Sequence, residues 1–335
     1  MEIENVIIIG GGPAGLAAAL YTARAGLNPI VVAGQTPGGQ LMLTTDVENY
    51  PGFESILGPE LISKYKSHAE KFGTRFINDN VDHVDFSKKP HTIYLSSGKE
   101  MKAKSVLITT GASALWLGLP SETRLRGRGV SACATCDGFF FKDKTIAVVG
   151  GGDTAMEESL FLTKFANQIF IIHRRSEFRA SKIMQNRVLK HPKIIVLWKS
   201  EVEEVLGEQR VEGLKIKTDN NTTIKQLNNK SILKTDGLFL AIGHKPDTGF
   251  LKDSGVILDK KGYIKTSALM AWEMVANKNT KYQILNTKYQ YSTNINGIFA
   301  AGDCVDYVYR QAGTAVGMGI AAALEIERYL ENQES

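Results

Sequence analysis

Two cysteines separated by two residues carry the most distinctive chemistry in this chain. Cys133 and Cys136 lie in the stretch Ser-Ala-Cys-Ala-Thr-Cys-Asp-Gly, with Asp137 directly after the second cysteine. A pair at this spacing can form a small-ring disulfide, be reduced to a dithiol and re-form. The neighbouring carboxyl group can manage a proton as a thiolate leaves or forms. The stretch 131–138 is therefore predicted to be a reversible redox centre.

A zinc site is the main alternative for such a pair. Zinc needs about four ligands, but the chain has only three cysteines, and its six histidines show no ligand spacing. The third cysteine, Cys304, stands alone and is expected to be a buried small hydrophobic residue. Three cysteines are also too few for a secreted disulfide scaffold, so a catalytic pair in a reducing compartment is favoured.

A glycine-rich loop lies near the N-terminus. Gly10, Gly12 and Gly15 form Gly-x-Gly-x-x-Gly directly after the β-branched run Val6–Ile9, and Pro29–Ala33 is the next expected strand. In a strand–turn–helix–strand frame, this motif places the pyrophosphate of a dinucleotide at a helix N-terminus. A purely structural glycine turn is the alternative.

The second strand of this unit lacks the acidic residue that an NAD site usually has. Ala33-Gly34-Gln35 stands there instead, and Gln35 can hydrogen-bond a ribose hydroxyl. The missing acid argues against NAD at this first site and leaves FAD open. A polar loop follows, in which Gly39, Gln40 and Asn49 suit a wall around a polar ring system; a solvated loop is the alternative.

A second glycine loop follows the cysteines. Gly150, Gly152, Asp153 and Thr154 belong to Gly-x-Gly-x-x-Ala, directly after the β-branched run Thr145–Val149. Alanine is allowed at the third position of this fingerprint. The pair of cysteines therefore lies between two predicted dinucleotide sites.

Arginines stand where an NAD site in this second unit would have a carboxylate. The expected strand Gln168–Ile172 is followed by Arg174 and Arg175, with Arg179 shortly after. Guanidinium groups bind a phosphate in a bidentate manner. The position thus predicts NADPH, whose 2′-phosphate the arginines would hold; an exposed basic patch is the alternative.

The remaining elements are expected from hydrophobic patterns. Asp303 ends the last apolar strand, where its carboxylate can accept hydrogen bonds from ligand hydroxyls or simply cap a turn. Further strands are expected at Thr74–Phe86, Thr92–Leu95, Ser105–Thr110 and Gly262–Thr266, with a last apolar strand over Gly297–Asp303. Gly237–Ile242, followed by Gly243–Pro246, is expected to be the return crossover between domains. A meander is expected from Ile194–Leu197, Glu203–Leu206 and Val211–Thr218, with a hairpin tip at Asp219–Lys230. Helices are expected at Leu16–Ala25, Gly58–Phe72, Ala155–Phe165 and Gly313–Leu330.

Length and composition favour an ordinary two-domain protein. The chain has 335 residues, 43% hydrophobic and 22% charged, with a net charge of +5. No long Lys/Arg run supports nucleic-acid binding, and no apolar run approaches the ~20 residues of a membrane span. The N-terminus lacks the pattern of a secretory signal. A cytoplasmic location is the default expectation.

These motifs together resemble those of the low-molecular-weight (bacterial-type) thioredoxin reductases, a branch of the class II pyridine nucleotide-disulfide oxidoreductases. The match runs in the family's order over nearly the whole chain. The matching stretches are Gly10–Gly15, Gly38–Leu41, Thr45–Gly52, Cys133–Gly138, Gly150–Glu158, His173–Arg175 with Phe178-Arg179, Ile242–Pro246, Phe299–Asp303 and Tyr309–Ala312.

The resemblance implies an α/β fold with two Rossmann-like three-layer nucleotide-binding domains. The FAD domain is expected to be discontinuous, residues 1–114 and 244–335, and to be interrupted by an NADPH domain, residues 115–243, that carries the cysteines. The implied enzyme passes electrons from NADPH to FAD, then to the Cys133–Cys136 disulfide, then to thioredoxin. Because NADPH and the disulfide belong to one domain and both must reach the flavin of the other, the domains are expected to rotate between half-reactions. The hinges are expected at Gly111–Leu119 and Ile242–Pro246.

The resemblance also assigns residues. Cys136 would face the flavin, Cys133 would attack the partner, and Asp137 would act as the acid/base. FAD would contact Gly10, Gly12, Ala14, Gly15, Gln35, Gly39, Gln40, Asn49, Asp303, Arg310, Gln311 and Ala312. NADPH would contact Gly150, Gly152, Asp153, Thr154, Arg174, Arg175 and Arg179. A homodimer is implied, with no nucleic acid, membrane or metal.

One segment departs from the family. Ser267–Asn296 is longer than the usual connection and is expected to form a surface helix or an altered dimer or partner contact. Two other functions stay open: a flavin disulfide reductase with another protein partner, and a redox sensor whose cysteine pair is regulatory. The peroxide-linked relatives carry an extra N-terminal module, and the first strand here begins close to Met1, which disfavours that branch.

Overall fold

A computed structural model describes residues 2–35, 37–43, 46–219, 231–276 and 288–334. The chain forms two compact units, which we call unit 1 (Met1–Ser113 with Lys245–Ser335) and unit 2 (Ala114–His244). The boundaries expected from the sequence differ from these by one residue at each crossing. No helix in the described ranges is long and apolar enough to cross a membrane.

Unit 1 is built on a mixed sheet. β1 (Ile3–Ile9) pairs in parallel with β2 (Ile30–Val32) on one side and with β8 (Glu100–Ile108) on the other. β2 also pairs in parallel with β5 (Arg75–Ile77), and β19 (Ile298–Ala300) pairs in parallel with the carboxyl-terminal part of β8. Parallel strands that are buried on both faces have continuous runs of β-branched residues in their sequence. For this reason β1 and β2 were recognisable in the sequence.

The amino-terminal part of β8 continues the sheet in antiparallel fashion through β7 (His91–Leu95) to β6 (Val81–Asp85). The prediction of one strand over Thr74–Phe86 is wrong, because β5 and β6 are separate strands on opposite edges of the sheet. Between them, the Asp79 carboxylate accepts a hydrogen bond from the amide of Ser97 (3.2 Å), which fixes a turn where the chain leaves β5.

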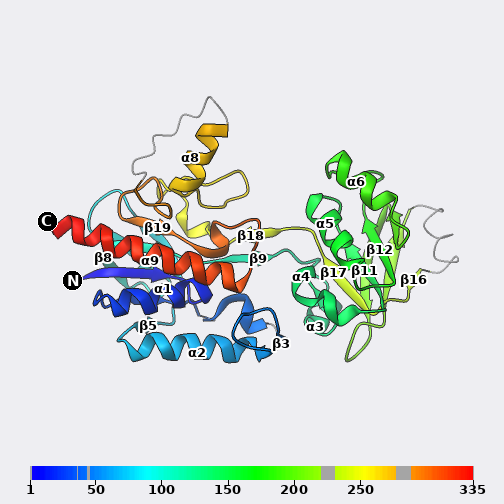
Figure 1. The fold of residues 1–335 in the computed structure, drawn as a ribbon, viewed down its shortest axis with the longest axis horizontal. Coiled ribbons are helices and arrows are strands. Elements are labelled where there is room, and N and C mark those ends of the chain that lie inside the picture. Colours follow the sequence, from blue (N-terminus) through cyan, green and yellow to red (C-terminus); the bar gives the residue numbers. More distant parts are fainter. Residues whose placement is uncertain (1, 36, 44–45, 220–230, 277–287, 335) are drawn as a thin grey trace. The chain divides into compact units, whose positions relative to one another are not determined.

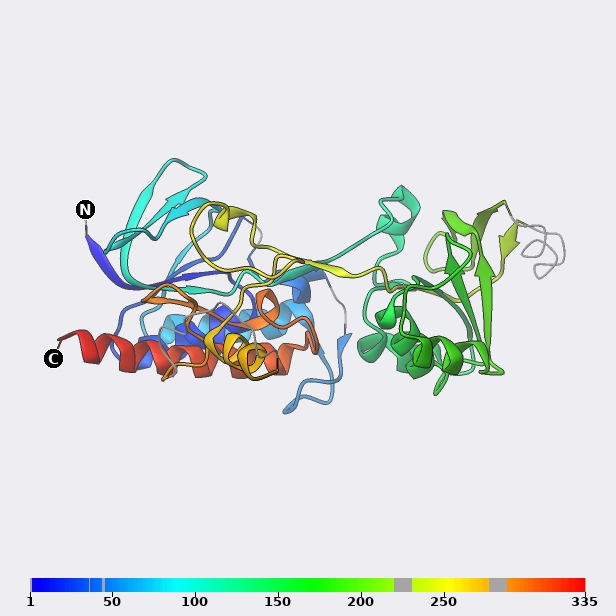
Figure 2. The ribbon, with the colours of Figure 1, turned by 90° about the horizontal axis from the view of Figure 1, so that it is seen from above.

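Two helices cover one face of the parallel strands, and side chains of β6 and β7 pack with the core on the other face. Val6 points toward α1 (Pro13–Arg24) and α9 (Ala312–Glu334), whereas Ile7 points to the core beneath β6 and β7. Figures 1 and 2 show α1 and α9 side by side on one face. α2 (Gly58–Lys71) packs along α1. Unit 1 is therefore layered, with its first glycine loop at the carboxyl end of β1.

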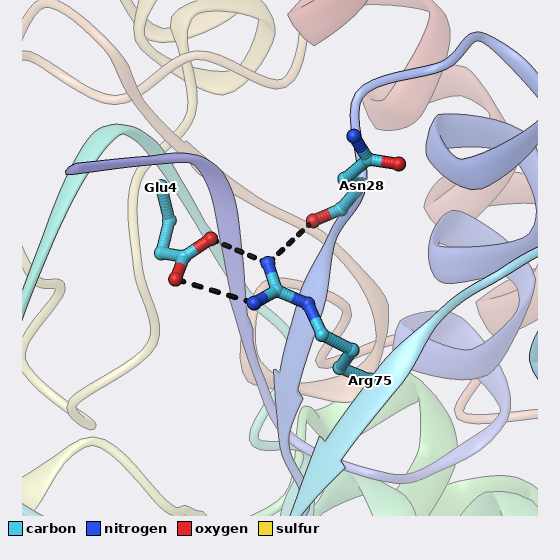
Figure 3. A network of polar contacts seen from close by, with 3 residues as sticks. All are labelled: Glu4, Asn28 and Arg75. Atoms are coloured by element: carbon cyan, nitrogen blue, oxygen red, sulfur yellow. Dashed lines mark hydrogen bonds and ion pairs between the residues drawn. The ribbon is translucent and has the colours of Figure 1, made fainter. Parts of the chain in front are cut away.

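A polar network ties the amino end of β1 to the edge strand β5 (Figure 3). The Arg75 guanidinium donates to the Glu4 carboxylate and to the carbonyl oxygen of Asn28 (3.1 Å). Arg75 is half exposed, so we assign this network a role in fixing local geometry rather than a large share of stability.

Unit 2 has a five-stranded parallel sheet. Its order is β10 (Val130–Ser131), β17 (Gly237–Leu240), β11 (Thr145–Val149), β12 (Gln168–His173) and β13 (Ile194–Trp198). The predicted meander is wrong at its first strand, because β13 extends this parallel sheet beside β12. A short apolar run has no feature that tells a parallel from an antiparallel neighbour.

The faces of the second sheet are covered differently. α5 (Asp153–Leu162) and α6 (Lys182–Leu189) pack on one face (Figure 1). The other face is covered by the antiparallel sheet of β14 (Ser200–Leu206), β15 (Gly213–Thr218) and β16 (Ile232–Leu233). Three layers result, and the α/β class is confirmed in both units.

The two chain crossings pair with each other as β9 (Ala112–Ala114) and β18 (His244–Pro246). Within the long segment 267–296, α8 (Ser267–Ala276) is a helix, as one of the expectations had it. No strand forms at Gly262–Thr266; a single bridge at Ile264 is found instead. Most of the predicted hairpin tip, residues 220–230, lies outside the described residues.

The short elements are β3 (Asp46–Val47), β4 (Ile56–Leu57), α3 (Pro120–Leu125), α4 (Ala134–Asp137), η1 (Gly39–Leu43), η2 (Gly138–Phe141), η3 (Gly249–Leu251) and η4 (Gly302–Cys304).

Candidate functional site

The two cysteines of unit 2 are joined. Cys133 and Cys136 form a disulfide with their Cα atoms 5.3 Å apart; Cys133 is the N-cap residue of α4 and Cys136 lies within this helix. The amide of Cys133 donates to the hydroxyl of Ser131 (3.0 Å), which anchors the pair to the end of β10. Cys136 is exposed and Cys133 is half-buried. The pair is therefore accessible and hydrogen-bonded to the end of a strand, as suits a dithiol–disulfide centre.

Polar groups near the sulfurs can handle a proton. The Thr135 hydroxyl lies 3.4 Å from the Cys133 sulfur. Burial raises the pKa of Asp137, and a hydrogen bond from Ser131 lowers it in part. A carboxyl group with a raised pKa keeps its proton closer to neutral pH, which suits a general acid beside a departing thiolate.

Exposed aromatic rings follow the cysteine pair directly. Phe139 is 63% exposed and Phe140 is 42% exposed, both in η2. Exposed large apolar side chains beside a redox centre indicate a surface that a partner molecule covers. These rings were not among the residues predicted from the sequence, although their position after Gly138 was a usable signal.

In the first glycine loop of unit 1, two of the glycines lie so close to Thr109 that a side chain would not fit. Gly10 has φ +121°, and a Cβ there would lie 2.9 Å from the Thr109 hydroxyl oxygen. A Cβ at Gly15 would also meet this oxygen, at 2.7 Å. A Cβ at Gly12, in contrast, would meet no atom within 4 Å, and a Cβ at Gly39 would lie 3.6 Å from the Gly12 Cα. The loops at Gly12 and Gly39 thus border the same open space at the start of α1.

Other predicted residues of unit 1 are placed as follows. Ala14 is buried in α1, close to Gly302, where a Cβ would lie 2.8 Å from the Ala14 Cβ. The exposed Gln35 has its amide hydrogen-bonded to Asn80 (3.1 Å), and Gln40 is exposed in η1.

Two residues that are 262 positions apart in sequence meet in unit 1. The Asn49 side-chain amide donates to the Gln311 side-chain oxygen (3.2 Å). Gln311 directly precedes Ala312, the first residue of α9, and follows Arg310, which has a left-handed φ of +49°. The structure therefore brings the polar loop and the start of α9 together, as expected of parts of one binding site.

Asp303 has a buried carboxylate oxygen with no hydrogen-bond partner among the described residues. Its pKa is raised to about 7, chiefly by burial and also by the charge of Asp306, while the charge of Arg310 lowers it in part. The hydroxyl oxygen of Thr110 is likewise buried and unpaired within the described chain. Since β8 and β19 are parallel neighbours, these atoms lie at the same edge of the sheet. Orphaned buried polar atoms fit a polar ligand that supplies the missing hydrogen bonds.

Thr110 was not among the predicted site residues. The signal that was available is its position just beyond the end of the buried strand β8 and before Gly111. Ligands of open α/β sheets bind at the carboxyl ends of the strands.

The second glycine loop, in unit 2, has the same division between packed and open positions. A Cβ at Gly150 would lie 2.6 Å from the Ala155 Cβ, and one at Gly151 would overlap the ring of His173, with Nε2 2.8 Å away. A Cβ at Gly152 would meet nothing within 4 Å. Gly152 therefore borders open space at the N-terminus of α5, where backbone amides and the helix dipole favour an anion.

Polar residues in the first turn of α5 complete this loop. Asp153 accepts a hydrogen bond from the amide of Ser181 (2.8 Å), and this bond lowers the pKa of Asp153. Thr154 is half-buried. Asp153 thus stays ionised and holds the chain that follows β12 against α5.

The three predicted arginines lie exposed just beyond β12. Within the described residues, the guanidinium groups of Arg174, Arg175 and Arg179 make no ion pair. The amide of Arg179 donates to the carbonyl oxygen of Gly151 (2.8 Å), so the arginine segment is tied to the glycine loop. Burial lowers the pKa of His173, and the charges of Arg175 and Arg179 lower it further. The free guanidinium groups fit a phosphate bound beside Gly152.

Cys304 is buried, and its expected role as a small hydrophobic residue is confirmed. Burial raises the pKa of its thiol to about 12, so it stays protonated. Over the described ranges, no group of His, Cys, Asp and Glu side chains is arranged to hold a metal ion.

Comparison with known proteins agrees with these features. Residues 4–319 match the family model "Pyridine nucleotide-disulphide oxidoreductase". A thioredoxin reductase of Rickettsia conorii is 47% identical over 330 residues, 97% of this chain and 98% of that protein. A thioredoxin reductase of Streptomyces clavuligerus is 49% identical over 331 residues, 98% of this chain and 94% of that protein.

Solved structures agree as well. A thioredoxin reductase from Giardia duodenalis aligns with a TM-score of 0.86 at 35% identity, covering 99% of this chain and 100% of that one. One from Streptococcus pyogenes aligns with a TM-score of 0.84 at 36% identity, covering 98% and 99%.

Proposed function

Because the chain belongs to the pyridine nucleotide-disulphide oxidoreductase family, we propose that it is an NADPH-dependent flavoprotein that reduces the disulfide of thioredoxin. The observation that carries this proposal is the bonded pair Cys133–Cys136, accessible on unit 2 beside a glycine loop, with a second glycine loop on unit 1. Two relatives that are 47% and 49% identical over nearly the whole chain are named thioredoxin reductases.

FAD fits the residues of unit 1. The open space over Gly12 and Gly39 suits a pyrophosphate at the start of α1, and the unpaired oxygens of Asp303 and Thr110 suit hydroxyl or ring donors. The residues that would hold FAD are Gly10, Gly12, Ala14, Gly15, Gln35, Gly39, Gln40, Asn49, Asp303, Arg310, Gln311 and Ala312, to which we add Thr110.

NADPH fits the residues of unit 2. Its pyrophosphate suits the open space at Gly152 and the amides of α5, and its 2′-phosphate suits the exposed guanidinium groups. The residues that would hold NADPH are Gly150, Gly152, Asp153, Thr154, Arg174, Arg175 and Arg179.

Bound FAD supplies the two-electron transfer between NADPH and a disulfide. In the reduced enzyme, the Cys133 thiolate attacks one sulfur of the thioredoxin disulfide and forms a mixed disulfide, and the other thioredoxin sulfur leaves as a thiolate. Asp137 gives its proton to that thiolate. The Cys136 thiolate then attacks the Cys133 sulfur, which re-forms the Cys133–Cys136 disulfide and releases reduced thioredoxin.

The assignment of Cys133 as the attacking sulfur is supported by Thr135. A hydroxyl 3.4 Å from the sulfur can donate a hydrogen bond to a thiolate and stabilise it. The exposed rings of Phe139 and Phe140 support a protein as the substrate, because a small disulfide would not need so large an apolar surface.

Domain rotation, a homodimer and a cytoplasmic location belong to the same proposal. Rotation is supported by the two crossings, where the chain passes between units at Ser113/Ala114 and His244/Lys245. A dimer is supported by exposed Tyr307, Val308 and Tyr309 in unit 1. A crosslink that fixes the two units should stop turnover and leave one half-reaction, and sedimentation measures the oligomeric state.

The decisive experiment is NADPH oxidation by the purified protein with and without oxidised thioredoxin, repeated with NADH. Rapid thioredoxin-dependent oxidation of NADPH is expected. Cys133→Ser and Cys136→Ser should each abolish thioredoxin reduction and leave flavin reduction by NADPH intact. Turnover with another disulfide protein but not with thioredoxin would assign a different partner, and slow oxidation with every disulfide would assign a redox sensor.

A further inference from the structure

The carboxylate of Asp306 organises the segment that leads into α9. Its Oδ1 accepts hydrogen bonds from the amides of Val308 (2.8 Å) and Tyr309 (2.9 Å), and its Oδ2 accepts one from the amide of Arg310 (3.0 Å). Asp306 is only 6% exposed. One buried carboxylate therefore satisfies three consecutive backbone amides.

The segment it holds has an unfavourable backbone conformation. Arg310 has φ +49°, a left-handed conformation that costs about 1–2 kcal/mol for a residue other than glycine. Hydrogen bonds to all three amides up to Arg310 offset this cost. The amide of Gln311 then bonds the Thr314 hydroxyl (3.3 Å), and the Gln311 side chain meets Asn49 (3.2 Å).

Asp306 also acts on Asp303 through its charge. The amide of Asp306 donates to the carbonyl oxygen of Gly302 (3.0 Å), so the two carboxylates belong to one turn. The negative charge of Asp306 raises the pKa of Asp303, which burial has already raised, and the charge of Arg310 lowers it. Other titratable neighbours are the hydroxyls of Tyr263 and Tyr291 and the thiol of Cys304, which have raised pKa values and stay protonated near neutral pH.

We propose that Asp306 is a positioning residue for FAD binding: it does not touch the flavin but holds Arg310 and Gln311 in the binding conformation, beside Asp303. This inference rests on the proposed function, in which Asp303, Arg310 and Gln311 hold FAD. Asp303 must be ionised to accept hydrogen bonds through both oxygens, so FAD affinity falls as the pH drops below its pKa.

Two variants separate the geometric role from the electrostatic one. Asp306→Ala removes all three amide hydrogen bonds and the charge. Asp306→Asn removes the charge but keeps one oxygen that can accept from Val308 and Tyr309. Asp259 provides the control, because its Oδ1 accepts amide hydrogen bonds from Lys261 (2.7 Å) and Tyr263 (2.8 Å) in another turn of unit 1.

The measurement is FAD affinity of the apoprotein, by quenching of flavin fluorescence, across a pH series. We expect Asp306→Ala to weaken FAD binding at least about tenfold, or about 1.4 kcal/mol, and Asp259→Ala to leave FAD affinity unchanged even if it lowers stability. Asp306→Asn should bind FAD with a smaller loss, and its affinity should start to fall at a lower pH than that of the wild type. NADPH affinity should be unchanged in all variants.

A shift of the pH midpoint is the result that a merely structural residue would not produce. Wild-type FAD affinity and pH profile in both Asp306 variants would overturn the inference and leave the proposed function standing. So would equal losses of affinity in Asp306→Ala and Asp259→Ala. A wild-type apoprotein that does not bind FAD would instead refute the proposed flavin site itself.

Discussion

Adjacent glycines in the second loop are expected to respond to the same substitution in opposite ways. A Cβ at Gly152 would meet no atom within 4 Å, whereas one at Gly151 would overlap the ring of His173. The backbone of Gly152, with φ −97°, is open to alanine. Gly152→Ala should therefore leave the free energy of unfolding unchanged or raise it by up to about 1 kcal/mol, because alanine restricts the unfolded chain.

Gly151→Ala should lower stability, because His173 cannot easily move aside. Its ring is 6% exposed, is bonded through Nε2 to the carbonyl oxygen of Glu177 (2.9 Å), and packs against Phe178 and Trp198. Overpacking of this kind costs about 1–3 kcal/mol. Each kcal/mol corresponds to a fall in melting temperature of about 2–4 °C in a domain of this size.

NADPH affinity should be lowered by the substitution at Gly152 rather than by steric overlap at Gly151. The methyl group of Gly152→Ala occupies the space where we place the NADPH pyrophosphate, so the Kd for NADPH should rise at least about tenfold, or about 1.4 kcal/mol. Urea denaturation followed by circular dichroism gives the stability, titration gives the Kd, and the visible flavin spectrum serves as a control for unit 1. Tight NADPH binding by Gly152→Ala, or wild-type stability of Gly151→Ala, would refute the reasoning from these contacts.

Three further outcomes are expected. Arg174→Ala should raise the KM for NADPH about tenfold and leave the KM for NADH unchanged, because a charged hydrogen bond to the 2′-phosphate contributes about 1.5–3 kcal/mol. Steady-state kinetics with both nucleotides tests this expectation. Ser131→Ala removes the hydrogen bond that lowers the pKa of Asp137, so the protonated form of Asp137 should persist to higher pH. The alkaline limb of the pH profile of thioredoxin reduction should therefore move to higher pH. An unmoved or acid-shifted limb would contradict the assignment of Asp137. Glu122 is fully buried, pairs with Arg126 (2.7 Å) and accepts a hydrogen bond from the amide of Gly118 (3.0 Å). Because Glu122→Ala leaves this amide without its acceptor, it should destabilise the protein by about 1–3 kcal/mol, measured by denaturation. A change below about 0.5 kcal/mol would show that the pair is dispensable.

The features predicted well from the sequence are those with a local physical signature. The β-branched runs at β1 and β11 are each followed directly by glycines, which indicates a parallel strand, a tight turn and then a helix. The disulfide between Cys133 and Cys136 follows from their spacing. The α/β class and the family were recognised on these features, and both are confirmed.

The features that were missed depend on neighbours distant in the chain. β13 is a short apolar run whose parallel partner β12 is visible only in the folded sheet. The break after β5 depends on a carboxylate, Asp79, that reaches the amide of Ser97. Asp306 has ordinary neighbours in sequence, and its importance comes from its burial and from the three amides that it binds. Hydrogen bonds from side chains to the backbone have no periodicity that a pattern could reveal.

The position of β19 has a consequence for how the protein is made. β19 pairs with β8, yet it is synthesised only after all of unit 2. While the chain emerges from the ribosome, the carboxyl-terminal edge of β8 stays unpaired and α1 lacks its neighbour α9. Unit 2 is a continuous segment and can complete its core first. We therefore expect the order of folding to be the reverse of the order of the glycine loops, with the N-terminal loop the last to acquire its final surroundings.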